Sequence, residues 1–208
     1  QNHNSLWGWN MNSQKTLALI VALFILFLMP GLLISKMINP PKIINETILI
    51  SLNEVMASNG SAIADDDGEY NDWIEIHNYG EDAVDLEGYG LSDKESDPFR
   101  WVFPAVSIEP GEYMLIWASG KDRLDPDAPL HTNFSIKAEG EEVLLTHHSG
   151  TQIDFMEPTP MAPNISYGRY PNGTGAWFFY DESTPGEPNP EPVLFELLAP
   201  PIFSHEDR

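Results

Sequence analysis

From residue 48 onward, short apolar or alternating runs recur along the chain and are separated by Gly, Pro, Asn and Asp. Runs that are rich in Val, Ile, Tyr, Phe and Trp, spaced roughly ten residues apart and bounded by turn residues, are typical of β-strands in a sandwich or barrel. No long stretch after residue 40 has the period of a helix. The predicted strands are residues 48–57, 72–78, 89–93, 99–103, 113–119, 141–148, 152–156, 165–170 and 176–180.

The segment DWIEIHN alternates most clearly. Successive side chains of a strand point to opposite faces, so Ile74 and Ile76 share one face and Trp73, Glu75 and His77 share the other. We expect Glu75 on the polar face of a half-exposed strand. The alternative, a general acid or base, would need a desolvated carboxyl with a raised pKa.

The N-terminal part differs in character, because residues 16–35 contain no charged residue. About 20 apolar residues are what a helix needs to cross a bilayer. We expect residues 11–35 to form a transmembrane helix or signal anchor, with a cleaved signal peptide or a buried core helix as alternatives. Residues 1–10 are interpreted as a disordered upstream extension and residues 36–46, which contain two prolines, as a linker. Lysines flank the apolar run on both sides, so the positive-inside rule does not fix its orientation.

Charge divides the chain at a similar place. Residues 1–42 carry three lysines and no acidic residue, whereas the rest carries all 32 acidic residues, and the net charge of the whole chain is −22. An acidic body repels nucleic acid, whose binding needs clustered Lys and Arg, and it attracts cations. The absence of cysteine excludes disulfides, thiolate metal sites and cysteine nucleophiles.

Common catalytic motifs are absent from the sequence. It has no Gly-rich phosphate loop ending in Gly-Lys-Ser/Thr, no G-x-S-x-G elbow and no H-E-x-x-H. We expect its six histidines in turns or facing solvent, rather than in a zinc site or as a general base. The sequence motifs therefore give no candidate catalytic or cofactor-binding residues.

The acidic stretch IADDDGEYND is the best metal candidate. Asp65, Asp67 and Asp72 offer the hard oxygen ligands that Ca²⁺ prefers, and Gly68 allows a tight bend. The spacing does not fit an EF-hand, because placing Gly68 at the sixth loop position would put isoleucines at the first and twelfth. Two interpretations stay open: a calcium site, and a solvated acidic connection between strands.

Three motifs stand out in the order of the predicted strands: DWIEIHN, VDLEGYGLSD and PGEYMLIWASG. Together with LNEVMASN, RWVFP, SYGRYPNG and STPGEPN, they resemble a lamin-tail domain of the prokaryotic, surface-protein type, which we place at residues 47–190. The resemblance implies an immunoglobulin-like β-sandwich and a non-catalytic module. The residues to which it gives packing or turn roles are Trp73, Trp101, Trp117, Gly88, Gly90 and Gly111.

Residues 191–208 are interpreted as a proline-rich linker and the start of a downstream domain. The final APPIFSHEDR resembles the opening of a chitobiase C-terminal-like or fibronectin-associated domain. We expect an extracytoplasmic, cell-surface module that is anchored in a membrane by residues 16–35. It would bind a protein or cell-surface polymer, mediate adhesion, or position a neighbouring domain.

Two alternatives remain for the function. The first is the N-terminal accessory part of a larger surface enzyme with a CotH-like kinase domain, which the resemblance of the C-terminal residues suggests. The second is a carbohydrate-binding β-sandwich. It would need a row of aromatic side chains on one solvent-facing surface, whereas we expect most of the aromatic residues to be buried.

Overall fold

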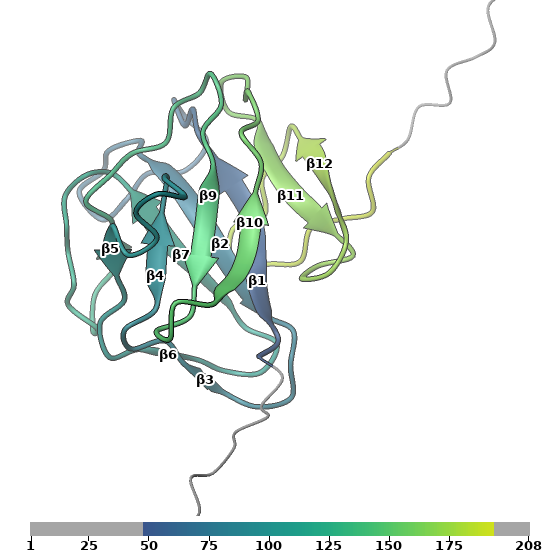
Figure 1. Ribbon diagram of the computed structural model, residues 1–208. Helices are drawn as coiled ribbons and strands as arrows, with labels where there is room; N and C mark the ends of the chain where they lie inside the picture. The colour runs from purple at the N-terminus through teal and green to yellow at the C-terminus, as the bar shows by residue number, and fades with distance from the viewer. Residues whose placement is uncertain (1–47, 194–208) are drawn as a thin grey trace, which may run out of the picture. The chain divides into compact units, whose positions relative to one another are not determined.

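The computed structural model describes residues 48–193, which form twelve β-strands and no helix. A six-stranded and a four-stranded sheet pack into a sandwich, with a two-stranded ribbon at one end (Figure 1). This is the immunoglobulin-like β-sandwich that the sequence predicts. The strands are β1 (Ile50–Met56), β2 (Asp72–Asn78), β3 (Val84–Asp85), β4 (Gly90–Ser92), β5 (Trp101–Val102), β6 (Ser107–Ile108), β7 (Tyr113–Ala118), β8 (Leu130–His131), β9 (Val143–Thr146), β10 (Gln152–Met156), β11 (Ser166–Tyr170) and β12 (Ala176–Tyr180).

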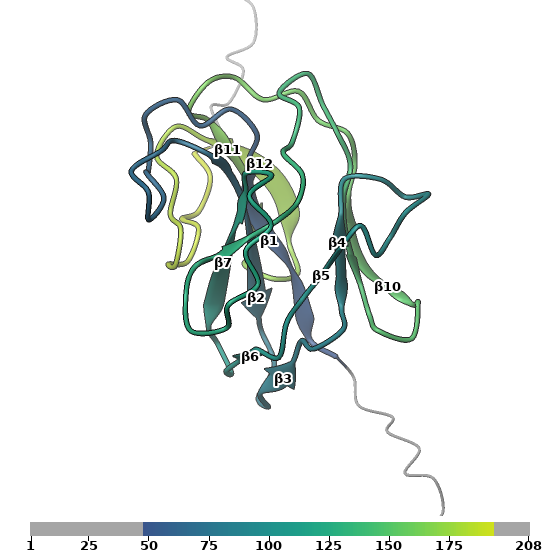
Figure 2. The same cartoon turned by 90° about the vertical axis from the view of Figure 1, so that its left-hand side faces the viewer.

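The two sheets differ in the number and order of their strands. The larger has the order β12-β11-β1-β2-β7-β8, the smaller the order β10-β9-β4-β5, and β3 pairs with β6. All pairings between these strands are antiparallel except β7 with β8. Figure 2 shows β1, β2 and β7 on one side of the sandwich and β4 and β10 on the other. In Figure 1 the β11–β12 hairpin extends past β10, the edge strand of the smaller sheet.

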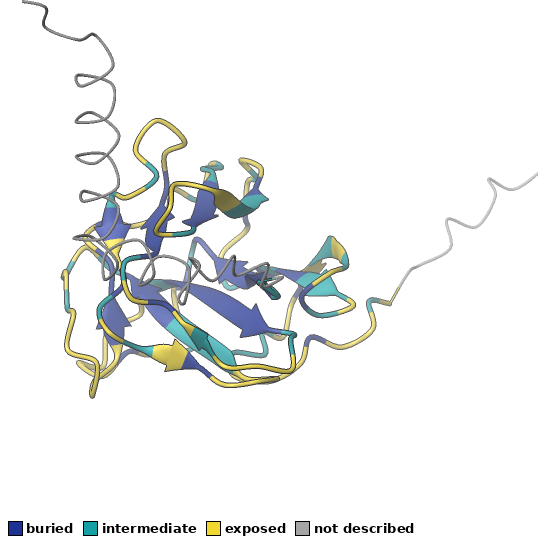
Figure 3. Cartoon of the chain, turned by 60° about the horizontal axis from the view of Figure 1, so that its bottom comes forward, coloured by how far each residue is buried: buried dark blue, intermediate teal, exposed yellow. Residues whose placement is uncertain are grey.

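The hydrophobic core lies between the two sheets. Ile74 and Ile76 of β2 join Leu91 and Leu145 of the smaller sheet in one fully buried apolar cluster. Burying an apolar side chain of this size stabilises the fold by about 2 kcal/mol. Figure 3 shows the same distribution, with buried positions concentrated in the strands and exposed positions in the loops. The alternation of β2 therefore places its isoleucines as the sequence predicts.

The opposite face of β2 is also covered. Trp73 packs with Met56 and Trp117 in a second apolar cluster. Glu75, on the same face, has an exposed fraction of 0%. The expectation that Glu75 lies on a half-exposed strand is therefore wrong, because other parts of the chain cover this face. The packing role implied for the tryptophans Trp73, Trp101 and Trp117 is confirmed, since all three are buried.

The glycines with implied turn roles divide into two kinds. Gly88 and Gly111 have φ values of +80° and +77°, a backbone conformation that favours glycine, and they lie in turns as expected. Gly90 instead begins β4, and a Cβ atom placed there would lie 2.2 Å from the carbonyl oxygen of Pro98. The turn role for Gly90 is wrong; glycine is needed there because two backbone segments approach closely.

A β-bulge in β1 lies next to the point where the β11–β12 hairpin is attached. The register shifts between Leu52 and Glu54, and the paired residues of β1 and β11 begin only at Glu54. The N–H of Leu52 donates to Oδ2 of Asp154 at 3.0 Å, and its carbonyl accepts from Nε of Arg169 at 2.9 Å. Arg169 also binds both carboxylate oxygens of Asp154, at 2.7 and 2.9 Å. One ion pair therefore takes the place of the missing strand neighbour and joins β10, β1 and β11.

The predicted membrane segment, residues 11–35, lies outside the described residues. Within residues 48–193, no helix has the length and apolar character needed to cross a membrane. The N-terminal helix, the upstream extension, the linkers and the downstream domain therefore stay predictions from the sequence.

Candidate functional site

The acidic loop, residues 65–69, is ordered around its first aspartate. Oδ1 of Asp65 accepts hydrogen bonds from the backbone N–H groups of Asp67 and Glu69, both at 2.9 Å. Oδ2 of Asp65 accepts from the side-chain amide of Asn71 at 2.8 Å. The N–H of Gly68, which has a φ of +80°, donates to the carbonyl of Asp65 at 3.0 Å. Asp65 therefore shapes the loop as well as contributing charge to it.

Two basic residues that follow β7 partly neutralise the four carboxylates of the loop. The Nζ atom of Lys121 lies 2.5 Å from Asp65, 2.7 Å from Asp67 and 2.9 Å from Glu69. Arg123 binds Asp67 at 2.5 Å. A lysine ammonium thus lies among three carboxylates, in the kind of oxygen-lined position that a cation would take.

Asp66 faces a third basic group. Its carboxylate binds Arg123 at 2.9 Å and lies 2.8 Å from Nε2 of His131. The other ring nitrogen of His131 is 2.8 Å from Oγ of Ser119. His131 is fully buried, so for this residue the expectation of a solvent-facing histidine is wrong.

The charges of Asp65 in the loop and of Lys121 beside it stabilise each other. Burial raises the pKa of Asp65, but the hydrogen bonds from Lys121, Glu69 N–H and Asn71 outweigh it and hold that pKa well below its usual range. Burial alone would lower the pKa of Lys121. Its carboxylate partners together have the larger, opposite effect, so the pKa lies above the usual lysine value. Both groups are therefore charged at neutral pH, and each stabilises the charge of the other.

The structure brings together only part of the predicted metal set. Ligand atoms of Asp65, Asp67 and Glu69 lie within 4.8 Å of one another, close enough to share one ion. Asp72 is outside this group: it begins β2, and its Oδ1 accepts from the backbone N–H of Asn59 at 3.2 Å. Any divalent cation bound by the three carboxylates would have to displace Lys121, the partner that the sequence pattern did not reveal.

A second polar site lies beneath residues 181–190, which we call the C-terminal strap. Glu54 of β1 and Glu75 of β2 are register partners, and both are fully buried. Thr184 of the strap donates its N–H to both oxygens of Glu54, at 3.3 and 3.2 Å. Gly186 donates its N–H to Oε2 of Glu75 at 2.6 Å. Two buried carboxyl groups thus hold the strap against the larger sheet.

Asparagine side chains complete this site. Asn53, the bulge residue of β1, donates to Oε1 of Glu75 at 3.0 Å and accepts from the N–H of Gly173 at 3.0 Å. Asn189 of the strap donates to the carbonyls of Asn53 and Arg169, at 3.3 and 3.1 Å. These contacts fasten the end of the strap to β1 and β11 at once.

Burial dominates the titration of both carboxyls. It raises the pKa of Glu75 to about 8, and it raises the pKa of Glu54 above its usual value. Ser166 donates to Glu54 at 2.5 Å. Among residues 48–193, no lysine or arginine forms an ion pair with either group. All the hydrogen-bond donors to Glu54 and Glu75 in the described part of the chain are residues of the domain. Such an enclosed set of contacts is typical of a structural network, whereas a general acid must reach a substrate.

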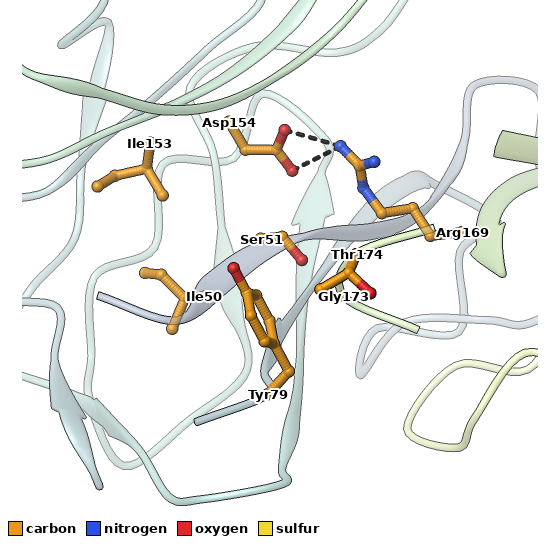
Figure 4. Close-up of a pocket in the computed structure, with 8 residues that line it drawn as sticks. All are labelled: Ile50, Ser51, Tyr79, Ile153, Asp154, Arg169, Gly173 and Thr174. Atoms are coloured by element: carbon orange, nitrogen blue, oxygen red, sulfur yellow. Dashed lines mark hydrogen bonds and ion pairs between the residues drawn. The ribbon is translucent and has the colours of Figure 1, made fainter. Parts of the chain in front are cut away.

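A hollow of about 300 Å³ lies beside the Asp154–Arg169 ion pair (Figure 4). It is lined by residues of β1, β10 and β11 and by Tyr79 and Thr174. The Arg169 guanidinium is already engaged by Asp154 and by the carbonyls of Leu52 and Gly175. It is therefore occupied with holding the hairpin and is poorly placed to bind a ligand.

The two packed sheets, which are antiparallel except for the pair of β7 and β8, define the class of the protein as an immunoglobulin-like β-sandwich. The sequence model of the lamin tail domain matches residues 46–159, more than half of the chain, and the chain belongs to that family. A search of curated proteins finds no match. The matched range ends before β11, β12 and the strap, although β11 pairs directly with β1.

We predict that Glu75 makes the fold less stable as the pH rises. Its pKa is raised from 4.5 to about 8, so the folded chain keeps a proton that the unfolded chain has lost between these values. The free energy of unfolding should fall over this interval, by at most about 1.4 kcal/mol per pH unit for one proton. In Glu75→Gln this contribution is absent, and urea unfolding at a series of pH values will show a flatter profile.

The matched control is Glu182→Gln, which changes an exposed residue of the same strap and should keep the native pH profile. Glu75→Gln also alters one hydrogen bond, so its absolute stability is not the readout. Parallel pH profiles of native protein and Glu75→Gln would contradict a raised pKa at this position.

The lysine in the acidic loop predicts how the chain responds to calcium. In Lys121→Met, the buried Asp65 carboxylate loses its cation, so the melting temperature in EDTA should fall by several degrees. Millimolar Ca²⁺ should then restore much of the loss, because the carboxylates of Asp65, Asp67 and Glu69 can bind it once the ammonium is removed. The native chain should respond less, since Lys121 competes. Lys137→Met, which removes an exposed ion pair elsewhere, serves as control.

An equal calcium shift in native protein and Lys121→Met would show that the ammonium is no competitor and that the native loop binds calcium directly. That interpretation would require the shift to disappear in the double variant Asp65→Asn and Asp67→Asn.

Proposed function

We propose that this chain is a non-catalytic lamin-tail module that is anchored in a membrane and displayed outside the cytoplasm. There it would bind a protein or cell-surface polymer and position a neighbouring domain. Its family is that of a non-enzymatic immunoglobulin-like module, which supports a role in interaction. The charge-free residues 16–35 and the acidity of the following part support the location.

The positioning role is supported by the hydrogen bonds that hold the strap against the larger sheet. β1 is the first strand of the described part, and the strap is among its last segments. Hydrogen bonds from Thr184, Gly186 and Asn189 connect the strap to β1 and β2. The chain therefore enters the domain through β1 and leaves it through the strap, and the two are directly bonded to each other. A domain attached after the strap would start from a fixed point rather than from a flexible end.

The charge of the domain supports the choice of partners. Nucleic acid is unsuited, because five of the six Lys and Arg residues among residues 48–193 are engaged in ion pairs with acidic residues: Arg100, Lys121, Arg123, Lys137 and Arg169. A CotH-like kinase downstream is compatible with this role, since the described module would then be the accessory part that holds it. This second arrangement rests on the resemblance of the C-terminal residues alone.

The location is tested by fractionating cells that produce the full chain. The protein should sediment with membranes and resist extraction by carbonate and high salt, and protease added to intact cells should digest the acidic part. The double variant Leu23→Arg and Leu26→Arg places two charges in the apolar run and should release the protein, because a charge at the centre of a bilayer is costly.

Leu124→Arg is the matched control, because it adds a charge at an exposed leucine of the folded domain and should leave the distribution unchanged. Recovery of the native protein in the soluble fraction would contradict the anchor. Protection of the acidic part from protease until the cells are lysed would contradict display outside the cytoplasm.

A further inference from the structure

We propose that the outer edge of β12 is a docking site for an extended, basic polypeptide segment, which would add to the larger sheet as another strand. This deepens the proposed function by naming the surface and the chemistry of the partner. The sandwich has four sheet edges, which in residues 48–193 are β12, β8, β10 and β5. An open edge carries unpaired N–H and C=O groups and can pair with another chain unless it is short, bulged or covered.

Three of these edges are blunted. β5 and β8 have two residues each. The far side of β8 is bonded to Arg123, whose N–H donates to the carbonyl of His131 at 2.9 Å. β10 is longer, but its register with β9 shifts between Gln152 and Asp154, which marks a bulge or irregularity.

Among the described residues, 48–193, the edge formed by β12 carries none of these protections. Five successive residues, Ala-Trp-Phe-Phe-Tyr, pair with β11 without a register shift, and they include no charge, proline or glycine. Every second residue of such an edge directs its backbone groups away from the sheet. Within the described part of the chain, β12 has β11 as its one strand neighbour. β12 is therefore the long, regular, apolar edge that proteins usually avoid leaving open.

An aromatic ladder leads to this edge. The guanidinium of Arg169 lies 4.6 Å from the ring centroid of Trp177, and the rings of Trp177 and Tyr167 stack at 5.2 Å with planes 19° apart. Tyr167 in turn contacts Phe179 at 4.7 Å. The ladder ends at Phe179, which is 55% exposed. A side chain from an added strand would extend the ladder beside Phe179, as cross-strand pairs do within a sheet.

This geometry favours a polypeptide over a sugar. A sugar ring needs aromatic faces that are open to solvent, whereas the rings of Tyr167 and Trp177 face each other. An added strand uses the backbone groups of β12 and needs only one side-chain contact at the exposed ring. The carbohydrate-binding alternative therefore has less support at this surface.

Charge determines which polypeptide fits. The chain carries a net charge of −22, and Asp181 and Glu182 are both exposed immediately after β12. A lysine-rich or arginine-rich segment would be attracted to this end of the strand, and an acidic one would be repelled. A second copy of the chain could also pair its β12 edge, but the same acidity opposes that association.

The test uses the full chain in mild detergent and two synthetic peptides of equal length, one of alternating lysine and valine and one of alternating glutamate and valine. Titration calorimetry should show binding of the lysine peptide and none of the glutamate peptide. Hydrogen exchange should slow at the backbone amides of β12 when the lysine peptide is bound.

Three variants locate the contact. Phe179→Lys should raise the dissociation constant of the lysine peptide by about tenfold or more, because it removes the ring and adds a repulsive charge. Phe179→Thr removes the ring without adding charge and should weaken binding in the same direction. Val102→Lys adds the same charge at an exposed residue of the β5 edge and should leave the affinity unchanged.

Three results would overturn the proposal. The first is the absence of any protection of β12 by the lysine peptide. The second is equal weakening by Val102→Lys, which would point to general charge attraction. The third is a concentration-dependent dimer that Phe179→Lys dissolves in sedimentation experiments, which would make a second copy the occupant. None of these results bears on membrane location, so the proposed function is tested separately.

Discussion

Two carboxyl groups, Glu54 and Glu75, are buried next to each other in the larger sheet, and no lysine or arginine among residues 48–193 forms an ion pair with them. Removing a carboxylate from water without compensation costs several kcal/mol. The pair is tolerated because donors surround it and because burial raises the pKa of Glu75 to about 8, so that this carboxyl keeps its proton at neutral pH. Those donors are Asn53, Ser166, Thr184 and Gly186. The buried acids and the strap depend on each other: without the strap the carboxyls lose donors and cover, and without the carboxyls the strap loses its acceptors.

This dependence has consequences for the extent of the domain. The family match ends at residue 159, yet the cover of the outer face comes from residues beyond it. The hairpin of β11 and β12 is joined to the rest by Arg169, which binds Asp154 and a carbonyl of β1. The part of the chain after the family match is thus bonded into the sandwich, and it also supplies the open edge at β12. The residues after 159 therefore both help to hold the sandwich together and carry the proposed docking surface.

The sequence predicts the features that depend on local pattern. Alternation places Ile74 and Ile76 in the core, and the implied packing of the tryptophans is observed. The fate of Glu75 cannot be predicted in this way, because its cover comes from Gly186, which is 111 positions away and lies in a polar stretch without strand periodicity. The acidic loop shows the same limit. Its aspartates are evident from sequence, whereas the lysine among them follows 56 positions after Asp65.

The strap is part of the folded domain and is held there by the two buried carboxyls. Amide hydrogen exchange at Thr184 and Gly186 in the full chain tests it most directly, because both N–H groups donate to these carboxyls. We predict that both amides exchange as slowly as those of β1 and β2, because they become exposed only when the whole domain unfolds. Exchange as fast as in an exposed loop would contradict it, since the strap would then open while the sandwich stays folded.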